Sequence, residues 1–168
     1  MRMLPLVSLL MVPLTLMVFG APARALEDAA ARGVMERAVD LYIKPGYADF
    51  HVRTTGLAKA TEALCREPST EGLQAVEAQF AQTVSSWARI EILRDGPVMQ
   101  DNRLERVLFY PDRKSTGLKQ VQALLASPEE TATDPETLKS RSVAMQGLGA
   151  FEYVIYGSYP ESITSQKQ

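Results

Sequence analysis

The chain has 168 residues, with 18 Lys and Arg against 20 Asp and Glu, which gives a net charge of −2. This mildly acidic balance, with no basic cluster along the chain, argues against nucleic acid or an acidic membrane surface as the main partner. His51 is the only histidine and no G-x-S-x-G motif accompanies it, so a serine-hydrolase mechanism is not expected.

The first 25 residues have the pattern of an export signal. Arg2 supplies a positive start, an uncharged apolar run extends from Leu4 to Phe19, and Ala23 and Ala25 fit an A-x-A cleavage site. The apolar run, about 16 residues, is short for a membrane span, although an uncleaved anchor remains an alternative. Cleavage after Ala25 would leave one modest domain with no stable membrane span. Its net charge would be −4, because Arg2 and Arg24 are lost from the −2 of the whole chain.

Glycine and proline punctuate a mostly helical pattern in the first half. We expect helices over 26–43 and 47–66, separated by a break at 44–46. The clearest helix is predicted over about 70–94, with Ser69 or Thr70 as its N-cap. Its apolar stripe recurs every three or four residues and comprises Leu73, Val76, Phe80, Val84, Trp87 and Ile90 or Glu91.

The second half predicts three more helices, over about 98–108, 117–126 and 135–156. Asp134 is a plausible N-cap for the last of these, with Pro135 at its first position. No convincing strand pattern is present, so helices joined by short loops predict an all-α helical bundle over residues 26–157. The tail, 158–168, has no core pattern and is expected to be flexible.

The last predicted helix carries one carboxylate among apolar side chains. At about 100° per residue, with Val143 as zero, Phe151, Ile155, Leu148 and Met145 fall on an arc between roughly 80° and 200°. Glu152 falls near 180°, inside that arc. A carboxylate on an inner face has to be paired, hydrogen-bonded, neutralised or bound to a metal. Glu152 is therefore the first candidate for function, either paired with an arginine or facing a cleft. Candidate lining or pairing residues are Arg89, Arg94 and Arg103.

Gly147 and Gly149 are unusual inside a helix, where each costs about 1 kcal/mol relative to alanine. They suggest close approach of another backbone, or a kink. Cys65 is the only cysteine, and a lone cysteine in an oxidising compartment is either buried and inert or waiting for a partner. Phosphate-loop, dinucleotide-binding, haem-attachment and H-E-x-x-H zinc motifs are absent from the sequence.

In this order and spacing, several segments together resemble the imelysin family, which includes M75 peptidases and iron-regulated envelope proteins. The resemblance rests on Ile43–Phe50, Leu64-Cys65, Trp87, Gly96-Pro97, Arg103–Arg106, Phe109–Asp112 and Ser142–Tyr153. It implies an all-α fold of two bundle halves, of which this chain corresponds to the first. It also implies that Cys65 lacks its natural partner, and that the chain could be a truncated half or could form a homodimer that covers its apolar surface.

The family hallmark is G-x-H-x-x-E, which is proposed as part of a metal site. Gly147, Gly149 and Glu152 occupy the matching positions, so glycine replaces the histidine. A site built on Glu152 would then be oxygen-rich, and its metal could be iron, zinc or calcium. The resemblance implies an exported, periplasmic or envelope protein with a binding role in metal or iron handling. The alternatives are an M75-type metallopeptidase and a non-catalytic helical module that binds an envelope partner or the missing half.

Overall fold

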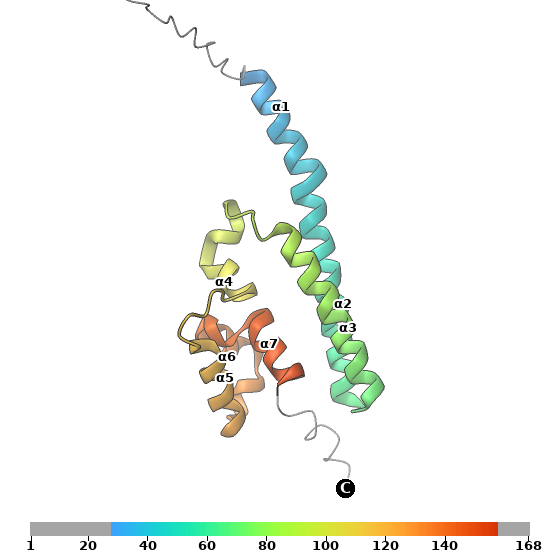
Figure 1. Ribbon diagram of the computed structural model, residues 1–168, viewed down its shortest axis with the longest axis vertical. Helices are drawn as coiled ribbons and strands as arrows, with labels where there is room; N and C mark the ends of the chain where they lie inside the picture. The colour runs from blue at the N-terminus through green and yellow to red at the C-terminus, as the bar shows by residue number, and fades with distance from the viewer. Residues whose placement is uncertain (1–27, 158–168) are drawn as a thin grey trace, which may run out of the picture.

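The computed structural model describes residues 28–157, and in that range every regular element is a helix (Figure 1). The predicted all-α class is therefore confirmed. The expected signal, 1–25, and the expected flexible tail, 158–168, lie outside the described residues. Among the helices of the described part, none is long and apolar enough to cross a membrane.

The first helices form one rod. Helix α1 (Asp28–Ala38) passes through the π-helical turn η1 (Val39–Ile43) into α2 (Lys44–Arg66) (Figure 1). The predicted break at 44–46 is wrong. The N–H of Lys44 donates to Val39 O, five residues earlier, and Pro45 falls in the first turn of α2, where a missing N–H is tolerated.

Helix α3 (Thr70–Ile90) runs back along α2. Ser69 is its N-cap, as one of the two predicted choices, and its Oγ accepts from the Gly72 N–H at 3.0 Å. The helix ends at Ile90, four residues before the predicted end. Its core face also differs from the prediction, because Thr83 is fully buried whereas Val84 is 38 % exposed. The buried residues follow 4-3-4-3 spacing, which places Thr83 on that face and Val84 beside it.

Shorter elements form a second layer beside the α2–α3 pair (Figure 1). In chain order they are η2 (Gly96–Asn102), α4 (Arg103–Val107), α5 (Thr116–Ala126), η3 (Glu130–Thr133), α6 (Pro135–Ser140), η4 (Val143–Met145) and α7 (Gly147–Tyr156).

Two of the predicted helices are interrupted in this layer. The helix predicted over 98–108 is kinked, because Asp101 and Asn102 both have a φ of 54°. Asp134 caps α6 as predicted, accepting from the Thr137 N–H at 2.9 Å. The helix it starts does not reach Tyr156, however, because α6 ends at Ser140 and a new helix begins at Gly147.

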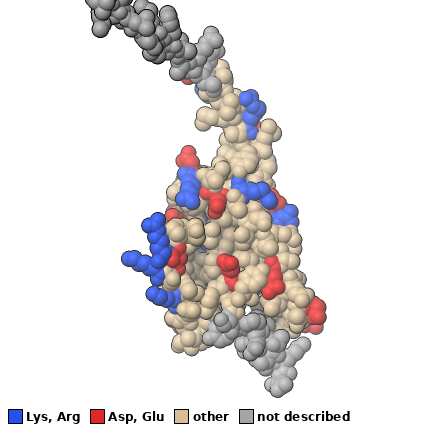
Figure 2. All heavy atoms as spheres, in the orientation of Figure 1, with Lys and Arg blue, Asp and Glu red and all other residues tan. Residues whose placement is uncertain are grey.

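Aromatic contacts in the core join α3 to the second layer and α2 to α3. Phe80 of α3 stacks on Phe151 of α7 with ring centroids 5.6 Å apart, and Phe50 of α2 packs on Trp87 at 5.2 Å. Helix α1, by contrast, buries none of its residues. Charged side chains of both signs are scattered over the face shown in Figure 2, with a basic group along the edge formed by the shorter helices.

Candidate functional site

Helix α7 presents two different faces. Leu148 and Ile155 are buried in the core, and Phe151 packs between them against α3. Gly149, Glu152 and Tyr153 are three and four residues apart, so they share the neighbouring face. This second face lines a hollow of about 210 Å³ between α7, α5 and the segment that joins α4 to α5. We call it the Glu152 pocket.

Gly147 determines where this face begins. Its φ is +72°, a left-handed conformation that favours glycine. A Cβ at this position would lie 2.3 Å from the carbonyl oxygen of Arg106 and 2.4 Å from that of Val107. The close backbone approach anticipated from the sequence is thus present at Gly147, against the end of α4.

Gly149 has the opposite environment. A Cβ there would meet Leu108 Cδ1 at 3.9 Å, which is ordinary van der Waals contact, and no nearer atom. The residue is exposed and lies on the wall of the pocket. The position that carries histidine in the family motif therefore has room for a side chain in this structure.

Asp112 organises the far wall of the pocket. Its carboxylate accepts from the backbone N–H groups of Thr116 at 2.6 Å and Gly117 at 2.8 Å, at the start of α5. Gly117 in turn packs against the backbone of η4, where an added Cβ would lie 2.2 Å from Ala144 O. Asp112 therefore serves to cap α5 and to hold the wall in place.

Arg106 and Gln146 hold the segment that leads into α7. Arg106 donates to Lys139 O at 2.8 Å and to Gln146 Oε1 at 3.1 Å. The Gln146 amide donates to Leu138 O at 2.8 Å and Arg141 O at 2.9 Å. Gln146 also lines the Glu152 pocket, so this network connects α4 and α6 to the pocket wall.

Glu152 itself is exposed, which corrects the expectation that its carboxylate lies on an inner face. The predicted arc was counted from Val143 and included Met145 as part of the same helix, but these residues belong to η4 and a break at Gln146 separates them from α7. Without them the buried arc is narrower, and Glu152 lies about 70° from its centre.

The three arginines predicted to line or pair with Glu152 lie elsewhere. Arg89 is on α3 and pairs with Asp49, Arg103 pairs with Asp101, and Arg94 is exposed in the loop after α3. Among residues 28–157, Glu152 has no ion pair. The sequence could not place these arginines, because their positions relative to α7 depend on how helices distant in the chain pack together.

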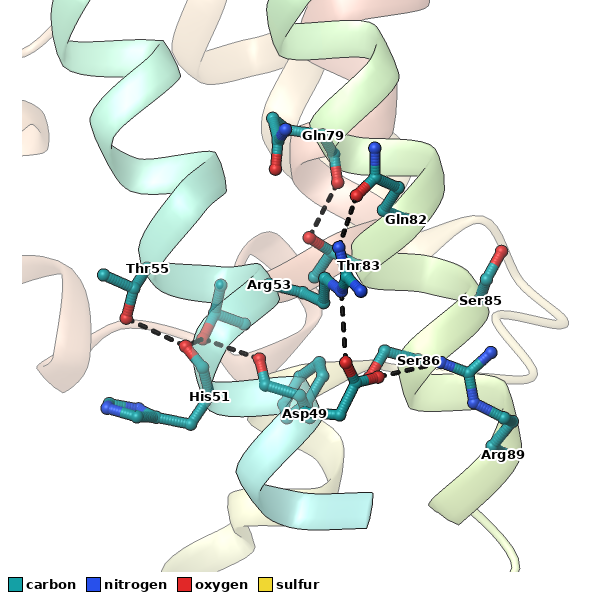
Figure 3. A network of polar contacts seen from close by, with 12 residues as sticks. Asp49, His51, Arg53, Thr55, Gln79, Gln82, Thr83, Ser85, Ser86 and Arg89 are labelled. Atoms are coloured by element: carbon teal, nitrogen blue, oxygen red, sulfur yellow. Dashed lines mark hydrogen bonds and ion pairs between the residues drawn. The ribbon is translucent and has the colours of Figure 1, made fainter. Parts of the chain in front are cut away.

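Arg89 belongs to a polar network between α2 and α3, centred on Asp49 (Figure 3). The Asp49 carboxylate accepts from Ser86 Oγ at 2.7 Å, from Arg89 at 2.8 Å and from Arg53 at 3.1 Å. These hydrogen bonds, that of Ser86 first, lower the pKa of Asp49 below its usual value. Because Ser86 is buried, the network satisfies its hydroxyl and fastens the two helices together.

The donor set of the Glu152 pocket does not fit a three-ligand zinc centre. Within 28–157 no three His, Cys, Asp or Glu side chains are grouped so that they could hold one ion. Asp112 is engaged with backbone N–H groups, and Gly149 has no side chain. His51 and Cys65 are exposed on α2 and do not line the pocket.

Sequence reasoning missed three residues of this pocket, namely Asp112, Gln146 and Tyr153. Tyr153 follows Glu152 directly, and its hydroxyl accepts from the Gln122 side chain of α5 at 3.1 Å. Asp112 could have been found, because an aspartate a few residues before a predicted helix is a typical capping signal. Gln146 had no recognisable signal, since its side chain bonds to Arg106 of α4 and to the carbonyl oxygens of Leu138 and Arg141.

These features define an all-α protein in which α7 carries the sequence glycine-x-glycine-x-x-glutamate and lines the Glu152 pocket. The family model Peptidase_M75, described as Imelysin, matches residues 43–167. Because the match covers most of the 168 residues, the chain belongs to the imelysin family, as the resemblance indicated. Helix α1 precedes the matched region. No curated protein and no solved structure matches the chain.

Proposed function

We propose that this protein is an exported, imelysin-like binding protein of the cell envelope, located in the periplasm where the source has one, and that it binds a cation at Glu152. One observation carries the proposal: the Glu152 carboxylate is exposed on the wall of a pocket and has no hydrogen-bond or ion-pair partner within residues 28–157. Asp49 and Asp112, in contrast, are committed to structural contacts. A carboxylate in a hollow without a partner is available to a ligand.

Oxygen atoms dominate the polar groups of this pocket. Glu152 offers a carboxylate, and Tyr110 and Tyr153 offer hydroxyl groups. Such a set favours hard cations such as calcium, or iron in an oxygen environment, over zinc, which prefers nitrogen and sulfur ligands. A role in metal or iron handling agrees with this chemistry and with the family.

We favour binding over peptide hydrolysis for this chain. A zinc-type peptidase needs about three protein ligands, an open coordination position and a base. The pocket has one uncommitted carboxylate, and glycine occupies the histidine position of the motif. The residues of this pocket therefore do not supply the ligands and the base that peptide hydrolysis needs.

Thermal unfolding with and without calcium, ferrous and zinc ions tests the binding proposal. A metal present at about 100 times its Kd should stabilise the protein by about 2.7 kcal/mol, which raises the midpoint by about 5–10 °C. Glu152→Gln should abolish the rise, whereas Glu67→Gln, at an exposed glutamate at the end of α2, should retain it. The proposal fails if no metal raises the midpoint, or if Glu152→Gln is stabilised as strongly as the unchanged protein.

A non-catalytic interaction module is the second candidate, because α1 exposes apolar side chains and buries none. Val34 is 52 % exposed and Met35 69 %. A partner that covers these apolar side chains would remove them from water and stabilise this end of the rod. The occupant could be a second copy, an envelope partner or a further half of the protein. Sedimentation velocity of the unchanged protein and of Met35→Glu distinguishes a homodimer from the others, since only self-association would be lost in the variant.

A further inference from the structure

A second cavity, of about 520 Å³, has walls that are almost entirely apolar, in contrast to the polar network of Figure 3. Phe50 and Tyr47 of α2, Trp87 of α3 and Val98 of η2 form much of the wall. We call it the Trp87 cavity. It shares no lining residue with the Glu152 pocket, and its size is in the range of small-molecule sites.

The course of the chain explains why space remains here. Helices α2 and α3 approach closely at Gly46, where a Cβ would lie 2.4 Å from Ile90 Cγ2. The chain then turns at Gly96, with a φ of +69°, into η2, and the left-handed residues Asp101 and Asn102 at the end of η2 redirect it. The turn holds η2 away from α2, and the cavity lies between them.

Trp87 brings an unpaired hydrogen-bond donor to the wall of this cavity. Trp87 is 2 % exposed, and its Nε1–H is buried with no acceptor in the described part of the chain. Tyr47 lines the same cavity with a phenolic hydroxyl, and burial raises the pKa of that group. An unpaired buried donor costs free energy, so an acceptor that reaches this wall would be favoured.

Arg103 adds a positive charge to the lining. Its guanidinium donates to Pro97 O at 2.9 Å and to Asp101 Oδ2 at 3.0 Å, and the remaining N–H groups are free to bind a ligand. Its side chain is half exposed. The one acid in the lining, Asp95, already accepts from the Gly96 N–H at 2.7 Å. The cavity therefore combines apolar walls with the Trp87 N–H donor and the Arg103 guanidinium. This combination complements an apolar molecule that ends in a hydrogen-bond acceptor.

We propose that the Trp87 cavity binds a small amphipathic carboxylate, with its apolar body between Phe50, Trp87 and Val98 and its carboxylate at Arg103. A guanidinium binds a carboxylate through charge-assisted hydrogen bonds, and the apolar body gains from leaving water. The site is independent of the Glu152 pocket and of any metal. It assigns the protein a second ligand of a different chemical class.

Trp87 is the only tryptophan of the chain, so its fluorescence reports on this cavity directly. Octanoate, 1-octanol and octylammonium each have eight carbons in an unbranched chain and differ in the end group. Titration of the whole protein at micelle-free concentrations should give a saturable change with octanoate, weaker binding of 1-octanol and the weakest binding of octylammonium. Octanoate should also raise the thermal unfolding midpoint, while sedimentation shows no change in oligomeric state.

Substitutions separate the two parts of the site. Arg103→Gln should weaken octanoate binding by about tenfold and leave 1-octanol binding nearly unchanged, since only the charged contact is lost. Arg113→Gln, at an exposed arginine outside the cavity lining, is the matched control and should bind both as before. Val98→Phe should fill the cavity and abolish binding of both compounds. If circular dichroism shows that this variant is unfolded, Val107→Phe fills the cavity from α4 instead.

Three results would overturn the proposal. The first is a fluorescence signal that does not saturate with octanoate, as when another segment of the chain already fills the cavity. The second is an Arg103→Gln variant that binds octanoate as tightly as the unchanged protein. The third is a response that depends on protein concentration and accompanies dissociation of a dimer, which would identify a second copy as the natural occupant.

Discussion

The two glycines of the motif should respond in opposite ways to the same substitution. Gly147→Ala places a Cβ on a residue with φ +72°, 2.3 Å and 2.4 Å from two backbone carbonyl oxygens. The left-handed conformation costs a non-glycine residue about 1–2 kcal/mol, and overpacking against a backbone adds about 1–3 kcal/mol. Gly149→Ala meets no close atom and removes the helix penalty of glycine, a gain of about 0.5 kcal/mol in the first turn of α7.

Far-ultraviolet circular dichroism during thermal unfolding measures both effects. For a chain of this size about 1 kcal/mol corresponds to 2–4 °C. Gly147→Ala should therefore lower the midpoint by about 5–15 °C, and Gly149→Ala should raise it by about 1–2 °C.

A third glycine separates conformation from contact. Gly96 has a φ of +69°, but a Cβ there would have no atom within 4 Å. Gly96→Ala should therefore lose only the conformational part, about 1–2 kcal/mol. Equal losses for Gly96→Ala and Gly147→Ala would show that the two carbonyl contacts contribute nothing. A loss at Gly149→Ala comparable to that at Gly147→Ala would refute the assignment of open space to the histidine position.

Two further predictions follow from the site and the polar network. Because hydrogen bonds lower the pKa of Asp49 in the folded state, its contribution to stability is present above its unfolded pKa, about 3.9, and is lost as pH falls through the lower folded value. Asp49→Asn should consequently lose less stability than the unchanged protein when the pH is lowered below about 4. Acid unfolding followed by circular dichroism measures this difference, and parallel acid curves for the two proteins would contradict it. Gly149→His should place an imidazole beside Glu152 and bind zinc at least about tenfold more tightly in calorimetric titration, with fold and stability retained. Unchanged zinc affinity in a folded variant would show that positions 149 and 152 do not share a site.

Helix capping was predictable because it depends on a few neighbouring residues. Ser69 and Asp134 cap α3 and α6 through hydrogen bonds to the second or third residue beyond them. These contacts form inside one turn, so the local sequence contains the whole signal.

The proline at position 45 shows the limit of such local signals. Pro45 and Gly46 have the composition of a break, yet the helix continues through a π-helical turn. Gly46 is needed because Ile90 of α3 packs against its backbone. The same residues would end a helix in another tertiary setting. The packing of α3 therefore decides whether the helix ends or continues at this point.

The sequence by itself determined the helical class, the capping residues, the existence of α3 as a long amphipathic helix, and membership of the imelysin family. Only the tertiary structure decided which side of each helix is buried. A new helix begins at Gly147, where the backbone lies close to the carbonyl oxygens of Arg106 and Val107. Because the helix begins there, Glu152 lies on an exposed pocket wall and not on the expected inner face. The physical reason is that capping and periodicity act within a few residues, whereas the environment of a side chain is set by elements distant in the chain.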